Sequence, residues 1–161
     1  MELVLIGGVS GSGKSVALAA LEDAGYDTIG NLPVALVVST VDHLAHQSEE
    51  SRVAIALDAK GEPGLPGIGA TIDELKARGW NVRFVFLDTK VETLVKRFSE
   101  TRRRHPFSSD TRTLTEAIEY ERSLLAEARA LGFAFDTSDL SAAALRGWIK
   151  DFIAVDPSKL T

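Results

Sequence analysis

Short apolar runs alternate with longer stretches of helical spacing along the chain. The runs are rich in valine, isoleucine and leucine, and several are bounded by glycine or end in aspartate, as strands of a buried parallel sheet do. The stretches between them place apolar residues on one helical face and end near glycine or proline. The pattern predicts strands over residues 3–6, 26–29, 52–57, 82–87 and 133–135, and helices over residues 14–24, 34–46, 71–78, 91–100, 114–131 and 142–153.

Strands of about five residues that alternate with helices of ten or more indicate βαβ units. The expected fold is therefore α/β, with about five parallel strands and helices on both faces. Ligands of such sheets bind beyond the carboxyl ends of the strands, where Gly7, Asp58, Asp88 and Asp136 are expected to lie along one edge. Residues 1–153 are expected to form one domain, and the polar residues 154–161 a tail or a linker.

The composition narrows the class of protein. The chain has 161 residues, of which 45% are hydrophobic and 25% charged, a balance typical of one globular domain. It has no cysteine, which excludes disulfide scaffolds, zinc–thiolate sites and thiol catalysis. The net charge of −5 argues against a surface that is basic throughout. No apolar run is long enough to span a membrane and the first residues lack the basic start of a signal peptide, so a cytoplasmic setting is expected.

The most specific motif is a glycine-rich loop near the start of the chain. Residues 8–15, GVSGSGKS, match G-x-x-x-x-G-K-[ST] completely, and they follow a predicted strand and open a predicted helix. Such a P-loop turns its backbone N–H groups and the positive helix end toward a phosphate, which makes the expected fold a three-layer P-loop NTPase fold. Lys14 is expected to neutralise the β and γ phosphates, and Ser15 to bind Mg²⁺. The predicted nucleotide-binding residues here are Gly8, Val9, Ser10, Gly11, Ser12, Gly13, Lys14 and Ser15.

A P-loop site also needs a carboxylate at the end of a neighbouring strand to hold the Mg²⁺ and its water shell. Asp58 is the first choice, because it is the first polar residue after the apolar run 53–57. Asp88 and Asp136 end predicted strands in the same way, but each can also cap a helix or a turn, and Asp136 could line a base pocket. The sequence therefore predicts Ser15 and Asp58 as the metal residues.

Positive charge is concentrated in residues 96–106, KRFSETRRRHP. One interpretation is a lid whose Arg102, Arg103 and Arg104 meet the charge of the transition state over a bound nucleotide, continuing into a loop at residues 108–110. A docking patch for RNA phosphate and a solvated helix end are the other two interpretations, and charge alone does not separate the three. His105 has no visible partner in the sequence and is assigned no chemistry.

Several segments together resemble the RapZ/YvcJ family of P-loop nucleotide-binding proteins. They are residues 8–18, residues 20–26, the Asn-Leu-Pro turn at 31–33, residues 97–106 and the Asp-Thr-Ser sequence at 136–138. The resemblance implies a small-kinase-like fold with a lid, which binds and slowly hydrolyses ATP and GTP with Mg²⁺ and acts as a regulator. The family includes an RNase adapter that presents a small RNA to an endoribonuclease and so controls aminosugar synthesis.

The resemblance also implies a second nucleotide-contact segment, made of Asp58, Ala59, Lys60 and Gly61. The chain departs from the family at Gly30, where an aspartate is usual, and at Lys60, where an arginine is favoured. The family chain is nearly twice as long, and its C-terminal half carries RNA binding. An RNA or protein partner is therefore expected to bind through such a C-terminal half, to which residues 154–161 would link this domain. A homo-oligomer is also compatible with the sequence.

Three functions are compatible with these observations. The favoured one is a regulatory nucleotide-binding domain with weak hydrolysis, in which Lys14, Asp58 and arginines 102–104 carry the chemistry. The alternative is a small-molecule kinase that transfers the γ-phosphate of ATP to a metabolite, and Gly30 weakens it because that position supplies no carboxylate. A scaffold with a vestigial loop is disfavoured because Lys14 and Ser15 are both intact. No residue that would orient the attacking water is evident, so slow turnover is expected.

Overall fold

The computed structural model describes residues 2–9, 11–45, 51–58, 65–101, 104–107, 111 and 113–154. Within them the chain forms a parallel sheet of five strands in the order β2-β3-β1-β4-β5, which confirms the predicted α/β fold. The loop after β1 therefore lies between the ends of β3 and β4. The strands are β1 (Glu2–Gly8), β2 (Asp27–Leu32), β3 (Arg52–Leu57), β4 (Asn81–Asp88) and β5 (Phe133–Asp136).

The central strands are buried on both faces. Successive side chains of a strand point to opposite faces of a sheet. In β1, Leu3 and Leu5 accordingly join one apolar cluster, whereas Val4 and Ile6 join the other. Burial on both faces explains why these strands appear in the sequence as nearly continuous apolar runs rather than as alternating ones.

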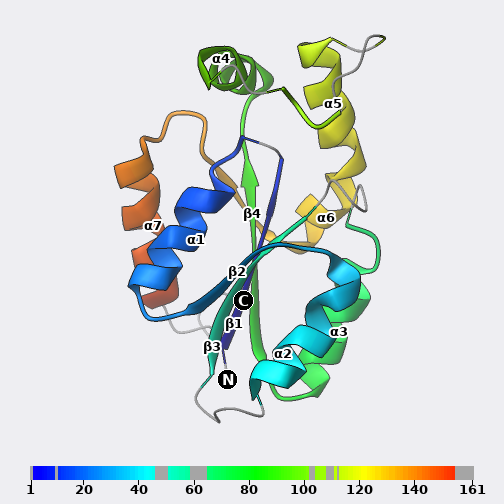
Figure 1. The fold of residues 1–161 in the computed structure, drawn as a ribbon, viewed down its shortest axis with the longest axis vertical. Coiled ribbons are helices and arrows are strands. Elements are labelled where there is room, and N and C mark those ends of the chain that lie inside the picture. Colours follow the sequence, from blue (N-terminus) through cyan, green and yellow to red (C-terminus); the bar gives the residue numbers. More distant parts are fainter. Residues whose placement is uncertain are drawn as a thin grey trace.

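Helices cover both faces of the sheet (Figure 1). The first and last helices lie on one face, and α2, α3 and α6 lie on the other, while α4 and the start of α5 lie beyond the carboxyl ends of the strands (Figure 1). This arrangement leaves the loop after β1 facing α4 and α5. The helices are α1 (Lys14–Asp23), α2 (Val37–Ala45), α3 (Ile68–Ala77), α4 (Val91–Thr101), α5 (Leu114–Leu124), α6 (Ala126–Leu131) and α7 (Ala142–Ala154).

The prediction of one helix over residues 114–131 is wrong. The helix is interrupted at Leu125, whose ψ of 1° departs from the helical value of about −42°. The side chain of Leu125 is buried in the core, and hydrogen bonds from its N–H to Glu121 and from Arg129 to its carbonyl continue across the bend. The apolar spacing and these hydrogen bonds both continue across the bend, and no proline or glycine stands there. The sequence therefore carries no signal that would mark the interruption.

Two smaller differences occur near the second strand. β2 extends to Leu32, three residues beyond the prediction for residues 26–29. The next helix begins with a short 3₁₀ turn over Val34–Leu36 before α2. No helix in the described ranges has both the length and the apolar character needed to cross a membrane.

Candidate functional site

The glycine-rich loop joins the buried end of β1 to the start of α1, and Ser10 within it lies outside the described residues. Gly11 and Gly13 have φ values of 84° and 105°, in the left-handed region that favours glycine. A Cβ atom at Gly13 would lie 2.8 Å from Leu145 Cδ2, and one at Gly8 would lie 2.6 Å from the carbonyl oxygen of Leu87. Glycine is therefore required by both backbone conformation and close packing.

The N-terminus of α1 is open to an anion. Gly13 occupies the N-cap position, no side chain caps the helix, and no acidic residue lies in its first turn. The N–H groups of the first turn of a helix have no partner within the helix. Uncapped N–H groups at the positive end of a helix bind phosphate well, so the backbone fits the group that the motif predicts.

Lys14 is the first residue of α1, and the charges of two acidic side chains act on its ammonium group. Burial lowers the pKa of Lys14, while the charges of Glu121 and Asp58 act in the opposite direction. An ammonium that has lost part of its hydration gains strongly from an anion placed beside it. The structure thus brings Lys14 near the predicted Asp58 and near Glu121, which the sequence did not indicate.

Asp58 follows β3, beside the central strand. Its backbone N–H donates to the carbonyl of Leu32 at 3.0 Å, which extends the pairing of β3 with β2 to the carboxyl edge. Asn31, from the Asn-Leu-Pro turn, has a φ of 55°, a value that asparagine tolerates better than most residues. The turn and Asp58 are therefore neighbours at one edge of the sheet. The other three residues of the predicted contact segment, Ala59, Lys60 and Gly61, lie outside the described residues.

The two other strand-end carboxylates are held by neighbouring groups. Asp88 accepts from Arg129 Nε at 2.9 Å and forms an ion pair with Arg122 Nε at 3.6 Å. Asp136 accepts from the backbone N–H and the hydroxyl of Ser138, and these hydrogen bonds lower the pKa of its carboxyl group. Asp136 thus acts as a turn residue, which was one of the three roles open to it from the sequence.

The arginine segment is tied to the core through His105. His105 and Glu121 are both buried, and His105 Nε2 lies 3.2 Å from Glu121 Oε1. His105 Nδ1 accepts the backbone N–H of Phe107 at 3.1 Å, so we assign the ring hydrogen to Nε2, which donates to Glu121. Arg104 is exposed, whereas Arg102, Arg103 and residues 108–110 lie outside the described residues.

A second arginine, Arg97 of α4, joins two loops of the site. Its Nη1 donates to the carbonyl of Gly11 and its Nη2 to the carbonyl of Thr137, both at 2.8 Å. The Thr137 hydroxyl donates to the carbonyl of Ser12 at 2.7 Å, so the loop after β5 is fastened to the glycine-rich loop. Beside these contacts is a cavity of about 250 Å³, lined by Gly11, Ser12, Gly13, Val16, Arg97, Thr137, Leu140, Ser141, Ala142 and Leu145.

Glu121, His105 and Arg97 were not predicted as parts of the site. Glu121 lies in a helix with many exposed charges, and spacing alone places it near the apolar face with Ala117 and Ile118. The signal that could have identified Glu121 is the presence of a charged residue on the apolar face of a helix. Arg97 was included in the resembling segment, but its contacts join residues far apart in the sequence and have no local signature.

The described residues also fit a bound Mg²⁺ ion. They contain no group of three or more histidine, cysteine or acidic side chains that could hold a metal. Mg²⁺ at nucleotide sites usually binds one or two side chains together with phosphate oxygens and water. Ser15, in the first turn of α1, carries a hydroxyl and Asp58 a carboxylate, and both are oxygen donors of the kind that Mg²⁺ prefers.

The fold and the loop define a nucleotide-binding protein with a kinase-like P-loop fold. The chain is similar to the YorR protein of Bacillus subtilis, solved in complex with phosphorylated GDP, with a TM-score of 0.62, 16% identity, and coverage of 94% of this chain and 95% of that one. It is also similar to shikimate kinase from Acinetobacter baumannii, with a TM-score of 0.60, 16% identity, and coverage of 99% and 95%. Identities this low show the fold alone.

The chain belongs to the RapZ-like N-terminal domain family, whose model matches residues 1–157. This confirms the family expected from the sequence. A protein of Thiobacillus denitrificans, named nucleotide-binding protein, is 50% identical over 161 residues, which are 100% of this chain and 58% of that protein. A protein of the same name from Methylobacillus flagellatus is 50% identical over 153 residues, covering 95% and 54%. The chain thus spans just over half the length of these curated relatives.

Proposed function

We propose that this domain binds ATP and GTP with Mg²⁺, hydrolyses them slowly, and serves as the nucleotide-responsive part of a regulator. The observation that carries the proposal is the position of Lys14, whose partly desolvated ammonium lies near Glu121 and Asp58 at the open N-terminus of α1. A triphosphate placed there would gain both the backbone N–H groups and the lysine charge. The resemblance to ATP- and GTP-binding regulators supports the choice of nucleotide.

The roles of the residues follow from their positions. Residues 8–15 hold the phosphates, and Lys14 neutralises their charge. Ser15 and Asp58 hold Mg²⁺, which when bound offsets negative charge on the phosphates. Arg104 and its neighbours Arg102 and Arg103 are proposed to meet charge that develops during hydrolysis. The cavity beside Arg97 is proposed to take the base.

Slow turnover is part of the proposal. Orientation of the attacking water needs a polar group placed for that purpose. Asp88 and Asp136, the other described carboxylates at strand ends, are held by arginines and by Ser138. The domain is therefore expected to bind nucleotide well but to hydrolyse it slowly, as suits a regulator that responds to the bound nucleotide.

Substituting Asp58→Asn tests the metal role. The change keeps the size of the side chain but removes its charge, so Mg²⁺-dependent phosphate release should fall by about 10- to 100-fold. Binding of ATP measured by calorimetry in the presence of a chelator should not weaken, because Asp58 is not proposed to contact the phosphates and its substitution removes a negative charge near Lys14. Phosphate release and calorimetry with both nucleotides are the measurements.

Asp73→Asn is the matched control, because Asp73 is an exposed aspartate in α3, away from the carboxyl edge. It should leave hydrolysis and binding unchanged. Equal hydrolysis by the Asp58 variant and the wild type would contradict the metal role. If the wild type bound neither ATP nor GTP, the whole proposal would be contradicted, and only the scaffold with a vestigial loop would remain.

The same assay separates hydrolysis from phosphoryl transfer. A Cβ atom at Gly30 would lie 3.7 Å from Leu18 Cδ2, an ordinary contact, so the packing itself allows a side chain at this position. The carboxylate that the kinase alternative needs is therefore missing because residue 30 is glycine, although the packing would allow a side chain there. Consumption of ATP that depends strongly on an added sugar or aminosugar would replace the regulatory proposal with the kinase.

RNA binding is proposed to reside mainly outside this chain. The net charge is −5, so we expect a short RNA to bind with a Kd no tighter than about 10⁻⁵ M at physiological salt, in the range of non-specific contacts. Fluorescence anisotropy over a salt series measures this. Tight binding that is lost when Arg102, Arg103 and Arg104 are replaced by alanine would move RNA recognition onto the arginine segment.

A further inference from the structure

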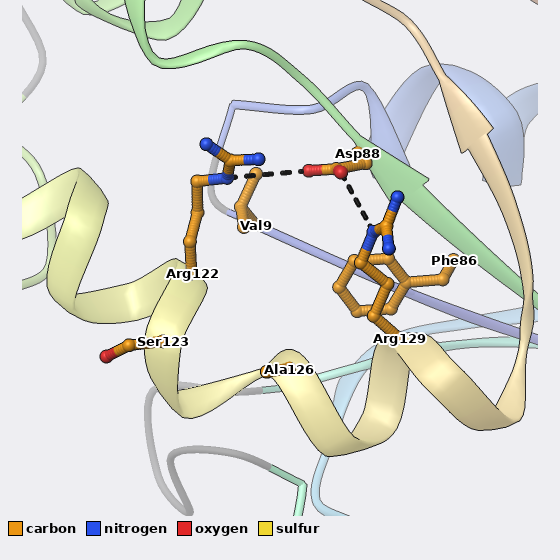
Figure 2. Close-up of a pocket in the computed structure, with 7 residues that line it drawn as sticks. All are labelled: Val9, Phe86, Asp88, Arg122, Ser123, Ala126 and Arg129. Atoms are coloured by element: carbon orange, nitrogen blue, oxygen red, sulfur yellow. Dashed lines mark hydrogen bonds and ion pairs between the residues drawn. The ribbon is translucent and has the colours of Figure 1, made fainter.

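A second cavity, of about 420 Å³, lies beside the end of β4, between the glycine-rich loop and the α5–α6 segment. Figure 2 shows Asp88 at the end of β4 with the side chains of Arg122 and Arg129 directed toward it from the helical segment. The cavity shares no lining residue with the one beside Arg97. Its lining residues are Val9, Phe86, Asp88, Arg122, Ser123, Ala126 and Arg129.

The charged side chains of this cavity are one carboxylate and two guanidinium groups. Arg129 Nε donates to Asp88 Oδ2 at 2.9 Å, and Arg122 Nε lies 3.6 Å from Asp88 Oδ1. Asp88 Oδ1 also accepts the backbone N–H of Thr89 at 2.9 Å. The cavity therefore carries one positive charge more than its carboxylate neutralises.

The arginines contact Asp88 through only part of their donor groups. A guanidinium has five N–H donors, and both arginines use the Nε side toward Asp88. Within the described ranges, no hydrogen bond to another residue engages the terminal nitrogens of either group. Asp88 thus contacts one side of each guanidinium group and leaves the paired terminal donors, which suit a carboxylate or a phosphate.

The remaining walls indicate the size and character of the ligand. Phe86 and Val9 are buried apolar residues, and Ala126 adds a small apolar surface. The Ser123 hydroxyl donates to the carbonyl of Tyr120 at 2.7 Å, which leaves its oxygen able to accept. A compact molecule with one anionic group and a small uncharged body matches these walls.

We propose that this cavity binds a small anionic metabolite, a phosphate monoester or a carboxylate, through the terminal nitrogens of Arg122 and Arg129. Val9 belongs to the glycine-rich loop, so such a ligand would lie against the nucleotide site without occupying it. The cavity is a second binding site, through which a metabolite would influence the same loop. The proposal does not depend on nucleotide hydrolysis.

The test uses glycerol 3-phosphate and malonate as probes, titrated by calorimetry into the full chain. Lys14→Met protein serves as the background, because the glycine-rich loop then lacks its main cation, and the double arginine variant described next shows whether the response comes from this cavity. We expect millimolar or tighter binding of at least one probe, and at least a tenfold loss of affinity in the double variant Arg122→Gln/Arg129→Gln. The two probes distinguish a phosphate site from a carboxylate site.

Two further variants make the result specific. Arg146→Gln, at an exposed arginine of α7 on the other face of the sheet, should bind the probes as its parent does. Asp88→Asn should tighten binding severalfold, because it removes a negative charge beside both guanidinium groups. Loss of binding in Asp88→Asn, unchanged binding in the double arginine variant, or binding of neither probe to the Lys14→Met protein would overturn the proposal.

Discussion

Replacing Lys14 with methionine should lower the affinity of the domain for ATP and GTP by about 100-fold. Loss of one partner from a desolvated charge pair typically costs about 2–5 kcal/mol, and about 2.7 kcal/mol corresponds to a factor of 100. Methionine keeps most of the aliphatic length of lysine, so the packing at the start of α1 should be preserved. Calorimetry at neutral pH measures the affinity, and circular dichroism checks the fold.

The wild type should show a matching dependence on pH. Burial places the pKa of Lys14 below its ordinary value of 10.5, although Glu121 and Asp58 partly offset this. A bound phosphate favours the charged form, so nucleotide affinity should fall as the pH rises through the lowered pKa, and binding in that range should take up protons. Titrations in two alkaline buffers with different ionisation enthalpies detect the uptake.

Lys150→Met is the control for both experiments. Lys150 is an exposed lysine of α7, and its loss should change neither the affinity nor the proton uptake. If Lys14→Met retained the wild-type affinity, Lys14 would have no role in phosphate binding. A second outcome is that Lys14→Met loses the affinity, but the wild type takes up protons on binding only near neutral pH. Another group would then have to carry the proton.

Replacing Glu121 with alanine should destabilise the domain by about 3 kcal/mol. The change leaves the buried His105 Nε2 without its acceptor and removes a negative charge near Lys14. For a chain of this size the melting temperature should fall by about 6–12 °C. Glu119→Ala, at an exposed glutamate of the same helix, should stay within about 0.5 kcal/mol of the wild type. Calorimetric melting of the three proteins makes the comparison.

Glu121→Gln separates the charge of the residue from its packing. Glutamine can still accept from His105, so the loss of stability should be smaller than for alanine. The variant removes negative charge near the phosphate site, so ATP should bind more tightly, by about three- to tenfold. Weaker binding in this variant would mean that Glu121 supports nucleotide binding and does not compete with it.

Much of the fold could be predicted from the sequence, because β1, β3 and β4 are buried on both faces and stand out as apolar runs. The glycine-rich loop was equally visible, since Gly11 and Gly13 adopt backbone conformations that few other residues tolerate. Such signals are local. The break between α5 and α6 was missed because helical spacing continues through Leu125.

The parts of the site that depend on tertiary contacts could not be predicted in this way. Glu121 and Lys14 come close only because α5 lies beyond the carboxyl end of the sheet (Figure 1). Asp88 and Asp58 have similar sequence surroundings, and only the packing of Arg122 and Arg129 separates their environments. Local sequence therefore supplied the phosphate loop, whereas its charge partners required the packed structure.

The contacts of Arg97 with the glycine-rich loop and with the loop after β5 have a consequence for synthesis of the chain. The loop is made first, but Arg97 cannot join Gly11 to Thr137 until β5 has been added. A growing polypeptide should therefore acquire its full nucleotide affinity only late in synthesis. A nucleotide that binds only the finished domain stabilises that state by mass action, so nucleotide supply would favour completed molecules over partly folded ones.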